Sequence, residues 1–404
     1  MSSYIHTFIR GSDKIYFNSF SLKWICQTDS NDERISSDFY EKKSIQYAES
    51  ALNQIQIAVT TKCNLRCIYC QLYQNRPESM ENMSMATARE ILEHHRSIFQ
   101  TGTIILTGGE PLLNWEVTSL FLSKANGRKI IFTNALLLDE AKIDFCQANN
   151  VFIIVSSDGN LDCNNYSRKS VNGTNVADII HRKIKLLKYK GVAFGISLVL
   201  NNGNYYQLNN ICEWLLEEYS PMSLGINLPH YTIDYSWNYD ESRLIAEFLK
   251  VLHTSIDKGV FIDPIARYIS PIVHQKFKLH DCSSCGRKLV YYPNGKESNC
   301  ILQHIFTNGN EVDIWKNRST LHSEECEACY AIGVCGGGCI FDGNRFYGEG
   351  KFDKRRCGIV KSIVKEFLFI AARMHSGNKS EDLIACYSSL INNPINSCWS
   401  IGHD

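Results

Sequence analysis

The sequence predicts an α/β fold in which helices cover a parallel β-sheet. Six short apolar runs, rich in Ile, Val and Phe, are separated by longer amphipathic segments with helical spacing. Glycine or polar motifs follow the ends of four of these runs, where a barrel-like parallel sheet places its functional side chains. Apolar strands that alternate with helices indicate a parallel sheet with helices packed on it.

The expected strands can be read from the apolar runs. They are Ile55–Val59, Thr103–Leu106, Lys129–Phe132, Phe152–Val155, Ala193–Leu200 and Leu224–Asn227. The helices expected between them are Met85–Phe99, Trp115–Ala125, Asp139–Ala148, Asn175–Lys188 and Leu208–Glu218. One further helix, over residues 240–258, leads out of this repeating pattern.

A small β-rich module is expected before this core, over residues 1–50. Tyr4–Phe8 and Lys14–Phe20 flank the turn-forming residues 11–13, and a third strand is expected over Leu22–Thr28. Two roles stay open for this module. It could cap the core sheet, or its edge could accept a peptide strand by β-augmentation.

The composition is that of a globular protein with balanced charge. Lys and Arg together number 42, as do Asp and Glu, so the net charge gives no indication of a nucleic-acid or anionic-membrane partner. The first residues carry no signal-peptide pattern, and no apolar run approaches the ~18 residues of a membrane span. We therefore expect a cytoplasmic protein. Because thiols stay reduced in that compartment, the 17 cysteines indicate metal binding rather than disulfides.

Three of these cysteines directly follow the first expected strand. Cys63, Cys67 and Cys70 have the spacing C-x3-C-x2-C. Such a trio can supply three of the four ligands of a cubic iron–sulfur cluster and leave one iron for a ligand other than protein. An open position of this kind marks a reactive metal site rather than a structural one. A zinc knuckle with a distant fourth ligand is the alternative.

This spacing, with the aromatic Tyr69 before the third cysteine, resembles that of the radical S-adenosylmethionine (radical SAM) enzymes. The resemblance implies that the α/β core is a partial (β/α)6 barrel, open on one side. It also implies that Cys63, Cys67 and Cys70 are catalytic, because their [4Fe–4S] cluster would bind SAM and reduce it to a 5′-deoxyadenosyl radical. The cofactor would carry this chemistry, and the protein would position and shield it.

Later motifs match segments that face SAM in this family. The resemblance assigns SAM binding to Tyr69, Gly108, Gly109, Glu110, Pro111, Asn134, Ser156, Asp158 and Arg168. Glu110 would hold the SAM amine, and Arg168 would lie near the SAM carboxylate unless it is an ordinary surface arginine. Ala135 stands where the family has glycine and Ser157 where leucine is more usual, but neither departure touches the polar positions.

A second group of eight cysteines lies between Cys282 and Cys357. Its spacings, C-x9-G-x4-C and then C-x2-C-x5-C-x3-C, resemble the SPASM domain, which holds two auxiliary iron–sulfur clusters in radical SAM enzymes. The implied ligands of the first cluster are Cys285, Cys300 and Cys339, with Cys282 as the fourth. Those of the second are Cys326, Cys329, Cys335 and Cys357. If Cys282 does not bind, one iron of the first cluster would be open to a substrate thiolate. The expected total is three [4Fe–4S] clusters.

The chain is thus expected to have four parts. The β-rich module covers residues 1–50, the radical SAM core 51–265, the cysteine-rich SPASM extension 266–365, and a C-terminal helix and tail 366–404. The C-terminal helix pattern spans Ile359–Met374, and a weaker one lies near Glu381–Leu390.

Enzymes with a SPASM domain mostly act on peptides or proteins, so the resemblance implies a ribosomally synthesised precursor peptide as substrate. The expected reaction is hydrogen abstraction followed by an intramolecular thioether or carbon–carbon cross-link. The leader of that peptide would bind the N-terminal module, and a flavodoxin or ferredoxin would supply electrons. Candidates for the base that takes the released proton are Asp281, His230 and Tyr231.

Three alternatives remain open. An anaerobic sulfatase maturase would oxidise Cys or Ser to formylglycine, but such enzymes carry an acidic residue after the cysteine of G-x4-C, where this chain has Ile301. A small-molecule substrate is the second alternative. A non-catalytic iron–sulfur or zinc scaffold would explain the cysteines, but not the polar motifs in register with the strands.

Overall fold

The computed structural model describes residues 4–27, 37–42, 45, 51–74, 81–302, 318–376 and 388–389. The chain forms two compact units. Unit 1 combines residues 1–49, 240–282 and 317–404, and unit 2 combines residues 50–239 and 283–316. The cysteine-rich segment therefore contributes to both units. The boundaries at residues 50, 265 and 365 stay a prediction, and the weak helical pattern near Glu381–Leu390 lies largely outside the described residues.

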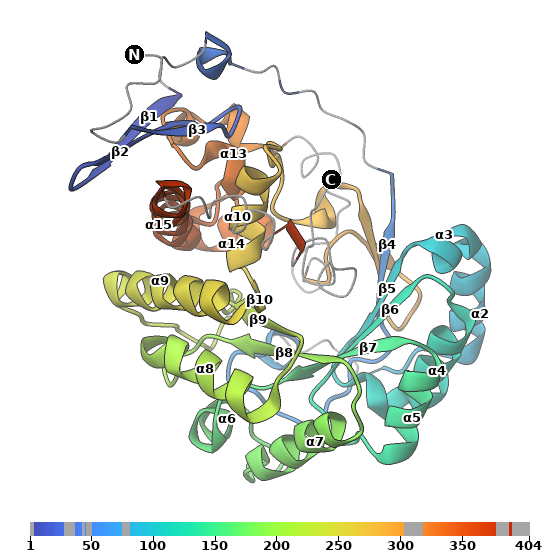
Figure 1. The fold of residues 1–404 in the computed structure, drawn as a ribbon. Helices are drawn as coiled ribbons and strands as arrows, with labels where there is room; N and C mark the ends of the chain where they lie inside the picture. Colours follow the sequence, from blue (N-terminus) through green and yellow to red (C-terminus); the bar gives the residue numbers. More distant parts are fainter. Residues whose placement is uncertain are drawn as a thin grey trace. The chain divides into compact units, whose positions relative to one another are not determined.

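Unit 2 is built on a parallel sheet whose first six strands pair in chain order (Figure 1). These strands are β4 (Gln54–Ala58), β5 (Thr103–Thr107), β6 (Arg128–Thr133), β7 (Val151–Ser156), β8 (Phe194–Val199) and β9 (Ser223–Asn227). Each is parallel to the next. The α/β prediction is confirmed, and all six expected strands are present.

The structure adds a seventh parallel strand to the six that were expected. β11 (Lys288–Tyr291) pairs with the free edge of β4, and β12 (Glu297–Ser298) returns antiparallel to it. The turn between them contains Gly295 at φ +80°, a backbone conformation that glycine adopts without strain. Cys285 and Cys300 flank this hairpin.

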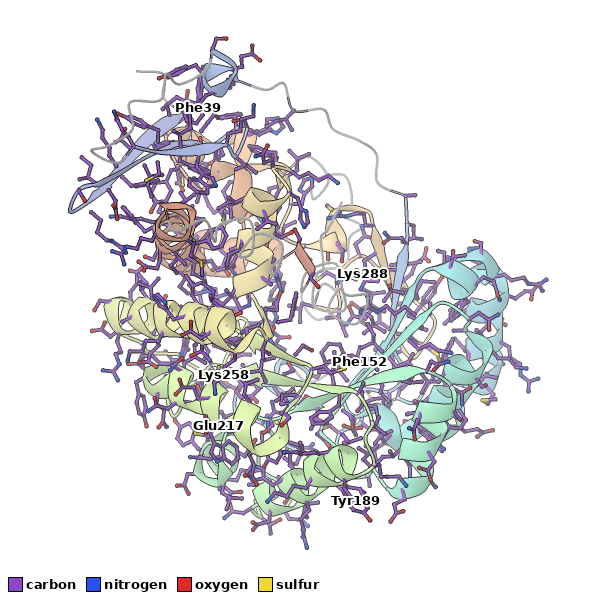
Figure 2. All side chains as sticks on the ribbon, viewed as in Figure 1. Phe39, Phe152, Tyr189, Glu217, Lys258 and Lys288 are labelled. Carbon is purple, nitrogen blue, oxygen red and sulfur yellow. The ribbon has the colours of Figure 1, made fainter. Side chains whose placement is uncertain are left out.

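Helices lie along the outer face of this sheet (Figure 1). They are α2 (Met85–His94), α3 (Arg96–Thr101), α4 (Trp115–Lys124), α5 (Glu140–Ala148), α7 (Ala177–Tyr189) and α8 (Leu208–Tyr219). Short helices α1 (Gln71–Gln74) and α6 (Leu161–Ser167) begin near the carboxyl ends of β4 and β7. The strand side chains are buried on both faces, as Phe152 in β7 shows, whereas Tyr189 at the end of α7 is 88% exposed and points into solvent (Figure 2).

The helix expected over Met85–Phe99 is broken at His95. This residue leaves the helical region (φ −112°, ψ 33°) and separates α2 from α3. Its Nε2 atom lies 2.7 Å from the hydroxyl of Tyr291 in β11. A contact with a strand almost 200 residues later cannot be read from local periodicity.

Unit 1 joins both ends of the described chain. An antiparallel sheet of β1 (Ile5–Arg10), β2 (Asp13–Asn18) and β3 (Trp24–Gln27) confirms the expected β-rich module. This sheet packs on α15 (Cys357–Ser376), with Arg10 paired to Glu366 at 2.6 Å and lying over the ring of Phe369.

The rest of unit 1 consists mainly of helices and turns, with one short strand. The larger elements are α9 (Glu241–Lys258), β10 (Phe261–Asp263), α10 (Ile265–Val273), α13 (Ile332–Cys335) and α14 (Ile340–Tyr347). α15 packs against α9 and α10. Among the described residues, no helix is long and apolar enough to cross a membrane.

Candidate functional site

The loop that carries the first three cysteines is fixed to unit 2 at both sides. We call residues 59–70 the cysteine loop. On one side, the N–H of Gly109 donates to the carbonyl of Thr60 at 2.8 Å, and the N–H of Glu110 donates to that of Lys62 at 2.8 Å. On the other side, the N–H of Arg66 donates to the carbonyl of Lys169 at 2.7 Å. Backbone bonds on both sides define the positions of the three thiols.

The glycine pair after β5 is explained by this packing. A Cβ atom on Gly108 would stand 2.3 Å from the carbonyl oxygen of Thr60, and one on Gly109 would stand 2.1 Å from that of Lys62. Gly108 also has φ +141°. Any larger residue would push the cysteine loop away. The two glycines therefore let the cysteine loop approach the end of β5 closely.

The thiols lie in an environment suited to metal-bound thiolates rather than free ones. Burial raises the pKa of Cys63 to about 11 and that of Cys67 above its usual range. The N–H of Leu65 donates to the Sγ of Cys63 at 3.4 Å, and the side-chain amide of Asn134 approaches the same sulfur at 3.8 Å. Buried thiols with N–H donors around them fit a metal centre, which lowers their pKa on binding.

Glu110 is enclosed by donors at the end of β5. Its carboxylate accepts from the hydroxyl of Thr133 at 2.7 Å, from the N–H of Asn134 at 2.8 Å and from the N–H of Leu112 at 3.1 Å. Burial nevertheless raises its pKa to about 7, with the hydrogen bonds opposing that rise. A cationic or N–H-bearing ligand placed beside it would favour the ionised carboxylate.

Asp158 holds two other members of the expected site. Its carboxylate accepts from the hydroxyls of Tyr69 and Ser167, each at 2.5 Å, from Arg168 at 2.9 Å, and from the N–H of Val199 at 3.0 Å. Asp158 has no exposed surface. All four hydrogen bonds to its carboxylate thus come from protein groups, and its contact with SAM stays a prediction. Asp158 positions Tyr69 and Arg168.

Arg168 is not a surface residue. It is 5% exposed, and its guanidinium reaches within 4.0 Å of the Sγ of Cys67. Burial alone would lower the pKa of Arg168, but Asp158 raises it above its usual value, so the cation persists at the cysteine loop. The alternative of an ordinary surface arginine is therefore wrong.

A cavity of about 410 Å³ connects these groups at the carboxyl ends of the strands. We call it the cysteine-loop cavity. Its walls include Cys63, Cys67, Cys70, Tyr69, Gly108, Gly109, Glu110, Asn134, Ser156 and Arg168. Of the residues assigned to SAM from sequence, Pro111 and Asp158 do not line it. Pro111 is buried at the start of a 3-10 turn, and its carbonyl accepts a hydrogen bond from the hydroxyl of Thr118 at 2.8 Å.

Several wall residues were not singled out from the sequence. They include Gln56, Ser197, Val199, Asn227, Leu228 and Leu302. Asn227 ends β9, and its amide donates to the hydroxyl of Ser197 at 3.1 Å. Those at strand ends could have been expected from the sequence, because the carboxyl ends of parallel strands meet at one edge of the sheet. Leu302 had no such signal in the sequence, because β11 was not among the expected strands, whereas Ile301 stood out only as a departure from the sulfatase maturases.

The three candidate bases differ in their surroundings. His230 lines the cysteine-loop cavity, whereas Tyr231 does not. Asp281 belongs to unit 1, where it is 4% exposed and bonded to Lys278 at 2.6 Å. Burial favours its neutral form, yet Lys278 and Arg267 hold the pKa of Asp281 below its usual range. A buried carboxylate paired in this way is a poor proton acceptor.

In unit 1, four later cysteines line one cavity, which we call the four-cysteine cavity. Its walls include Cys326, Cys329, Cys335 and Cys357, the set assigned to the second auxiliary cluster. Cys335 ends α13, and Cys357 begins α15. Three consecutive glycines, Gly336–Gly338, follow with φ values of +64°, +84° and +69°, so the chain turns through a conformation that other residues rarely adopt.

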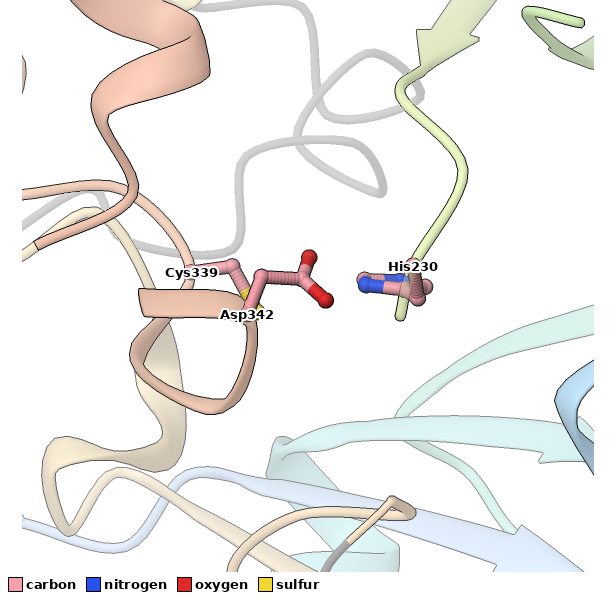
Figure 3. A group of neighbouring side chains, drawn as sticks. All are labelled: His230, Cys339 and Asp342. Atoms are coloured by element: carbon pink, nitrogen blue, oxygen red, sulfur yellow. The ribbon is translucent and has the colours of Figure 1, made fainter. Parts of the chain in front are cut away.

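The set assigned to the first auxiliary cluster is divided between the units. Cys285 and Cys300 belong to unit 2, while Cys282 and Cys339 belong to unit 1. Cys339 precedes α14, and Asp342 lies one turn into that helix (Figure 3). His230, also drawn in Figure 3, belongs to unit 2. The ligand assignment for this cluster stays a prediction.

Comparison with known proteins identifies the type of domain in unit 2. Residues 57–215 match the Radical SAM superfamily. The chain is 23% identical to the radical SAM cyclopropyl synthase TigE of Paramaledivibacter caminithermalis, across 81% of this chain and 77% of TigE. It is 24% identical to the cysteine-type anaerobic sulfatase-maturating enzyme of Clostridium perfringens, across 69% of this chain and 85% of that enzyme.

A solved structure shares the fold. SuiB of Streptococcus suis, crystallised with its precursor peptide SuiA, superposes with a TM-score of 0.56 at 14% identity, covering 88% of this chain and 99% of SuiB. SuiB has also been crystallised with S-adenosylmethionine, at a TM-score of 0.58. The similar proteins thus include a radical SAM cyclopropyl synthase, a sulfatase-maturating enzyme and a protein that binds a precursor peptide.

Proposed function

We propose that this chain, whose residues 57–215 match the Radical SAM superfamily, is a maturase that cross-links a ribosomally synthesised precursor peptide. One observation supports this most directly. The cysteine-loop cavity brings Cys63, Cys67 and Cys70 together with the polar residues assigned to SAM and with His230. The domain family implies SAM and a [4Fe–4S] cluster as cofactors.

The cysteine loop has the ligands that such a cluster requires. Cys63, Cys67 and Cys70 would hold three irons and leave the fourth open to SAM. When bound and reduced, this group would cleave SAM to the 5′-deoxyadenosyl radical, which removes a hydrogen atom from the peptide. Glu110 would accept from the SAM amine, and Arg168, held by Asp158, would attract the SAM carboxylate.

Closing the cross-link then releases one proton and one electron. We assign His230 as the base that accepts this proton, because it lines the cysteine-loop cavity whereas Tyr231 and Asp281 do not. The electron would pass to an auxiliary cluster, for which the four-cysteine cavity supplies a complete ligand set. With the first auxiliary cluster, whose assigned cysteines belong to both units, the proposed total is three clusters. A flavodoxin or ferredoxin would supply the first electron.

The wall of the cavity favours cross-linking over the sulfatase alternative. Sulfatase maturases resemble this chain around Cys300, but carry an acidic residue where this chain has Ile301. Ile301 and Leu302 form part of the cavity wall, so an apolar surface occupies that position. An aliphatic wall cannot take a proton, but it can exclude water from a carbon radical.

We assign leader binding to the N-terminal sheet of unit 1. Its order, β1-β2-β3, leaves β1 and β3 as edges. An extended peptide can add to such an edge through backbone hydrogen bonds.

The test is anaerobic reconstitution with candidate precursor peptides, followed by mass spectrometry of 5′-deoxyadenosine and peptide. We expect deoxyadenosine and a peptide lighter by two hydrogens, both absent in Cys63→Ala. His230→Gln should still produce deoxyadenosine while cross-linking falls at least ~10²-fold. Formylglycine in a sulfatase peptide, without any cross-linked product, would instead establish the sulfatase alternative. Absence of deoxyadenosine from fully loaded protein would refute radical catalysis.

A further inference from the structure

Unit 1 contains an arginine whose guanidinium nitrogens are shielded from solvent. Arg318 lies just before the 3-10 turn η5 (Thr320–His322). Its Nε, Nη1 and Nη2 atoms are all shielded from solvent, and none has a hydrogen-bond partner among the described residues. Buried polar groups are almost always paired, and an unpaired buried cation costs more than an unpaired neutral group. The guanidinium thus requires an anion or acceptor from outside the described chain.

The position of the guanidinium is defined by close packing. Its Cζ lies 4.7 Å from the centre of the Phe352 ring. On the other side it packs against α14, since a Cβ atom added to Gly343 would stand 2.6 Å from Nη2. The thiol of Cys339, at the start of α14, is close enough to raise the pKa of Arg318, although burial outweighs it and lowers that pKa to about 10.

Asp353, which also raises the pKa of Arg318, already pairs with other cations, and so does Asp342. Asp353 accepts from Arg355 at 2.8 Å and from Arg356 at 3.4 Å. Asp342 is paired with Arg355 at 2.8 Å. Among the described residues, both carboxylates are therefore shared with Arg355 and Arg356, and neither forms a hydrogen bond with the guanidinium of Arg318.

We propose that Arg318 compensates the negative charge of an iron–sulfur cluster bound through Cys339 and raises the reduction potential of that cluster. This inference rests on the proposed function, which assigns Cys339 to the first auxiliary cluster. A cubic cluster with thiolate ligands is anionic, and its sulfur atoms accept hydrogen bonds. It would therefore supply the guanidinium with a counter-charge and with hydrogen-bond acceptors. Net charge and N–H donors near the sulfurs are among the factors that set cluster potentials.

Such a charge would favour the reduced auxiliary cluster. Reduction adds one negative charge, and a cation at close range in a low-dielectric interior stabilises the more negative state. The cluster would then accept the electron released by the peptide more readily. Arg318 would be a positioning residue, because it acts on the cluster and not on the peptide.

The test compares Arg318→Met with wild type in two states. Methionine keeps the packing on Phe352 and removes the charge. In cluster-free protein the variant should melt higher, because a buried guanidinium without hydrogen-bond partners among the described residues is lost. In loaded protein its auxiliary potential should fall, changing the oxidised-to-reduced ratio at least tenfold at a fixed potential, or about 59 mV. Arg318→Lys should recover part of that shift. Arg345→Met, an exposed arginine of α14, is the matched control.

The potentials are best read by EPR in a background that carries Cys63→Ala, Cys67→Ala and Cys70→Ala, which removes the SAM-binding cluster. An unchanged potential, or a lower melting temperature of the cluster-free variant, would overturn the role of Arg318 while cross-linking by the wild type still upheld the proposed function. Wild-type protein that takes up no auxiliary cluster would overturn both.

Discussion

The buried carboxylate of Glu110 gives the sharpest prediction. Replacing it by glutamine removes the negative charge while keeping the shape of the side chain. A hydrogen bond to a charged group contributes about 1.5–3 kcal/mol, which corresponds to a loss of about 10- to 150-fold in SAM affinity. The variant also presents an amide donor toward the N–H of Asn134 or the hydroxyl of Thr133, so a small fall in melting temperature is expected as well.

The pH dependence separates this charge from simple packing. Because burial raises the pKa of Glu110 to about 7, the carboxylate is mostly ionised at pH 8 and mostly neutral at pH 6. With a pKa of 7, the ionised share falls from roughly 90% to roughly 10%, so the advantage of wild type over Glu110→Gln should shrink about tenfold. The advantage of wild type is expected to fall as the pH falls, because only the ionised carboxylate of Glu110 strengthens the contact with the SAM amine.

The assay is anaerobic calorimetry of SAM binding to protein with an oxidised cluster, which does not cleave SAM. Only the ratio of the two Kd values matters, because the amine of SAM also titrates near this range, as α-amino groups do at about 7.7–8.0. Glu116→Gln, on the exposed side of α4, is the matched control. A ratio that stays constant from pH 6 to pH 8, or a Glu110→Gln variant that binds SAM as tightly as wild type, would refute the reasoning.

Three further predictions concern other parts of the molecule. Asp158→Asn should leave Arg168 without its buried counter-charge, at a cost of about 3–5 kcal/mol, and lower the melting temperature of the loaded protein; an unchanged melting temperature would contradict the positioning role. Cys335→Ser should reduce the iron content by about four atoms per chain, the size of one cubic cluster, while SAM cleavage persists; full iron content would exclude a cluster in the four-cysteine cavity. Arg10→Met should weaken the attachment of the N-terminal sheet to Glu366 on α15 by about 1 kcal/mol and speed proteolysis within that sheet, and equal cleavage rates would show that the pair contributes nothing.

Local patterns in the sequence were sufficient to predict most of unit 2. The core strands are apolar over five or six residues, and the polar motifs follow them directly, so strand order and the rim of the site could be inferred together. The two glycines, Gly108 and Gly109, indicated from the sequence that another backbone segment comes close to them. The sequence did not indicate that this segment is the cysteine loop.

Features that depend on distant partners could not be predicted. β11 is only four residues long and is specified by pairing with β4, more than 200 residues earlier. Asp158 was assigned to SAM because of its motif, whereas its hydrogen bonds with Tyr69, Ser167, Arg168 and Val199 join residues that are brought together only by the fold. Arg318 had no motif at all, and only its burial without a hydrogen-bond partner among the described residues distinguishes it.

The interleaving of the two units has a consequence for how the chain is made. Unit 1 begins with residues 1–49 and is completed by residues 317–404, while unit 2 is interrupted after residue 239 and resumes at residue 283. During synthesis the N-terminal sheet therefore emerges long before α15, the helix on which it packs. A fragment that stops near residue 239 would leave the edge of β4 without β11, and an open strand edge invites pairing with other chains. Neither unit can be expressed as a simple truncation, and a fragment carrying both parts of either unit would need a designed connection.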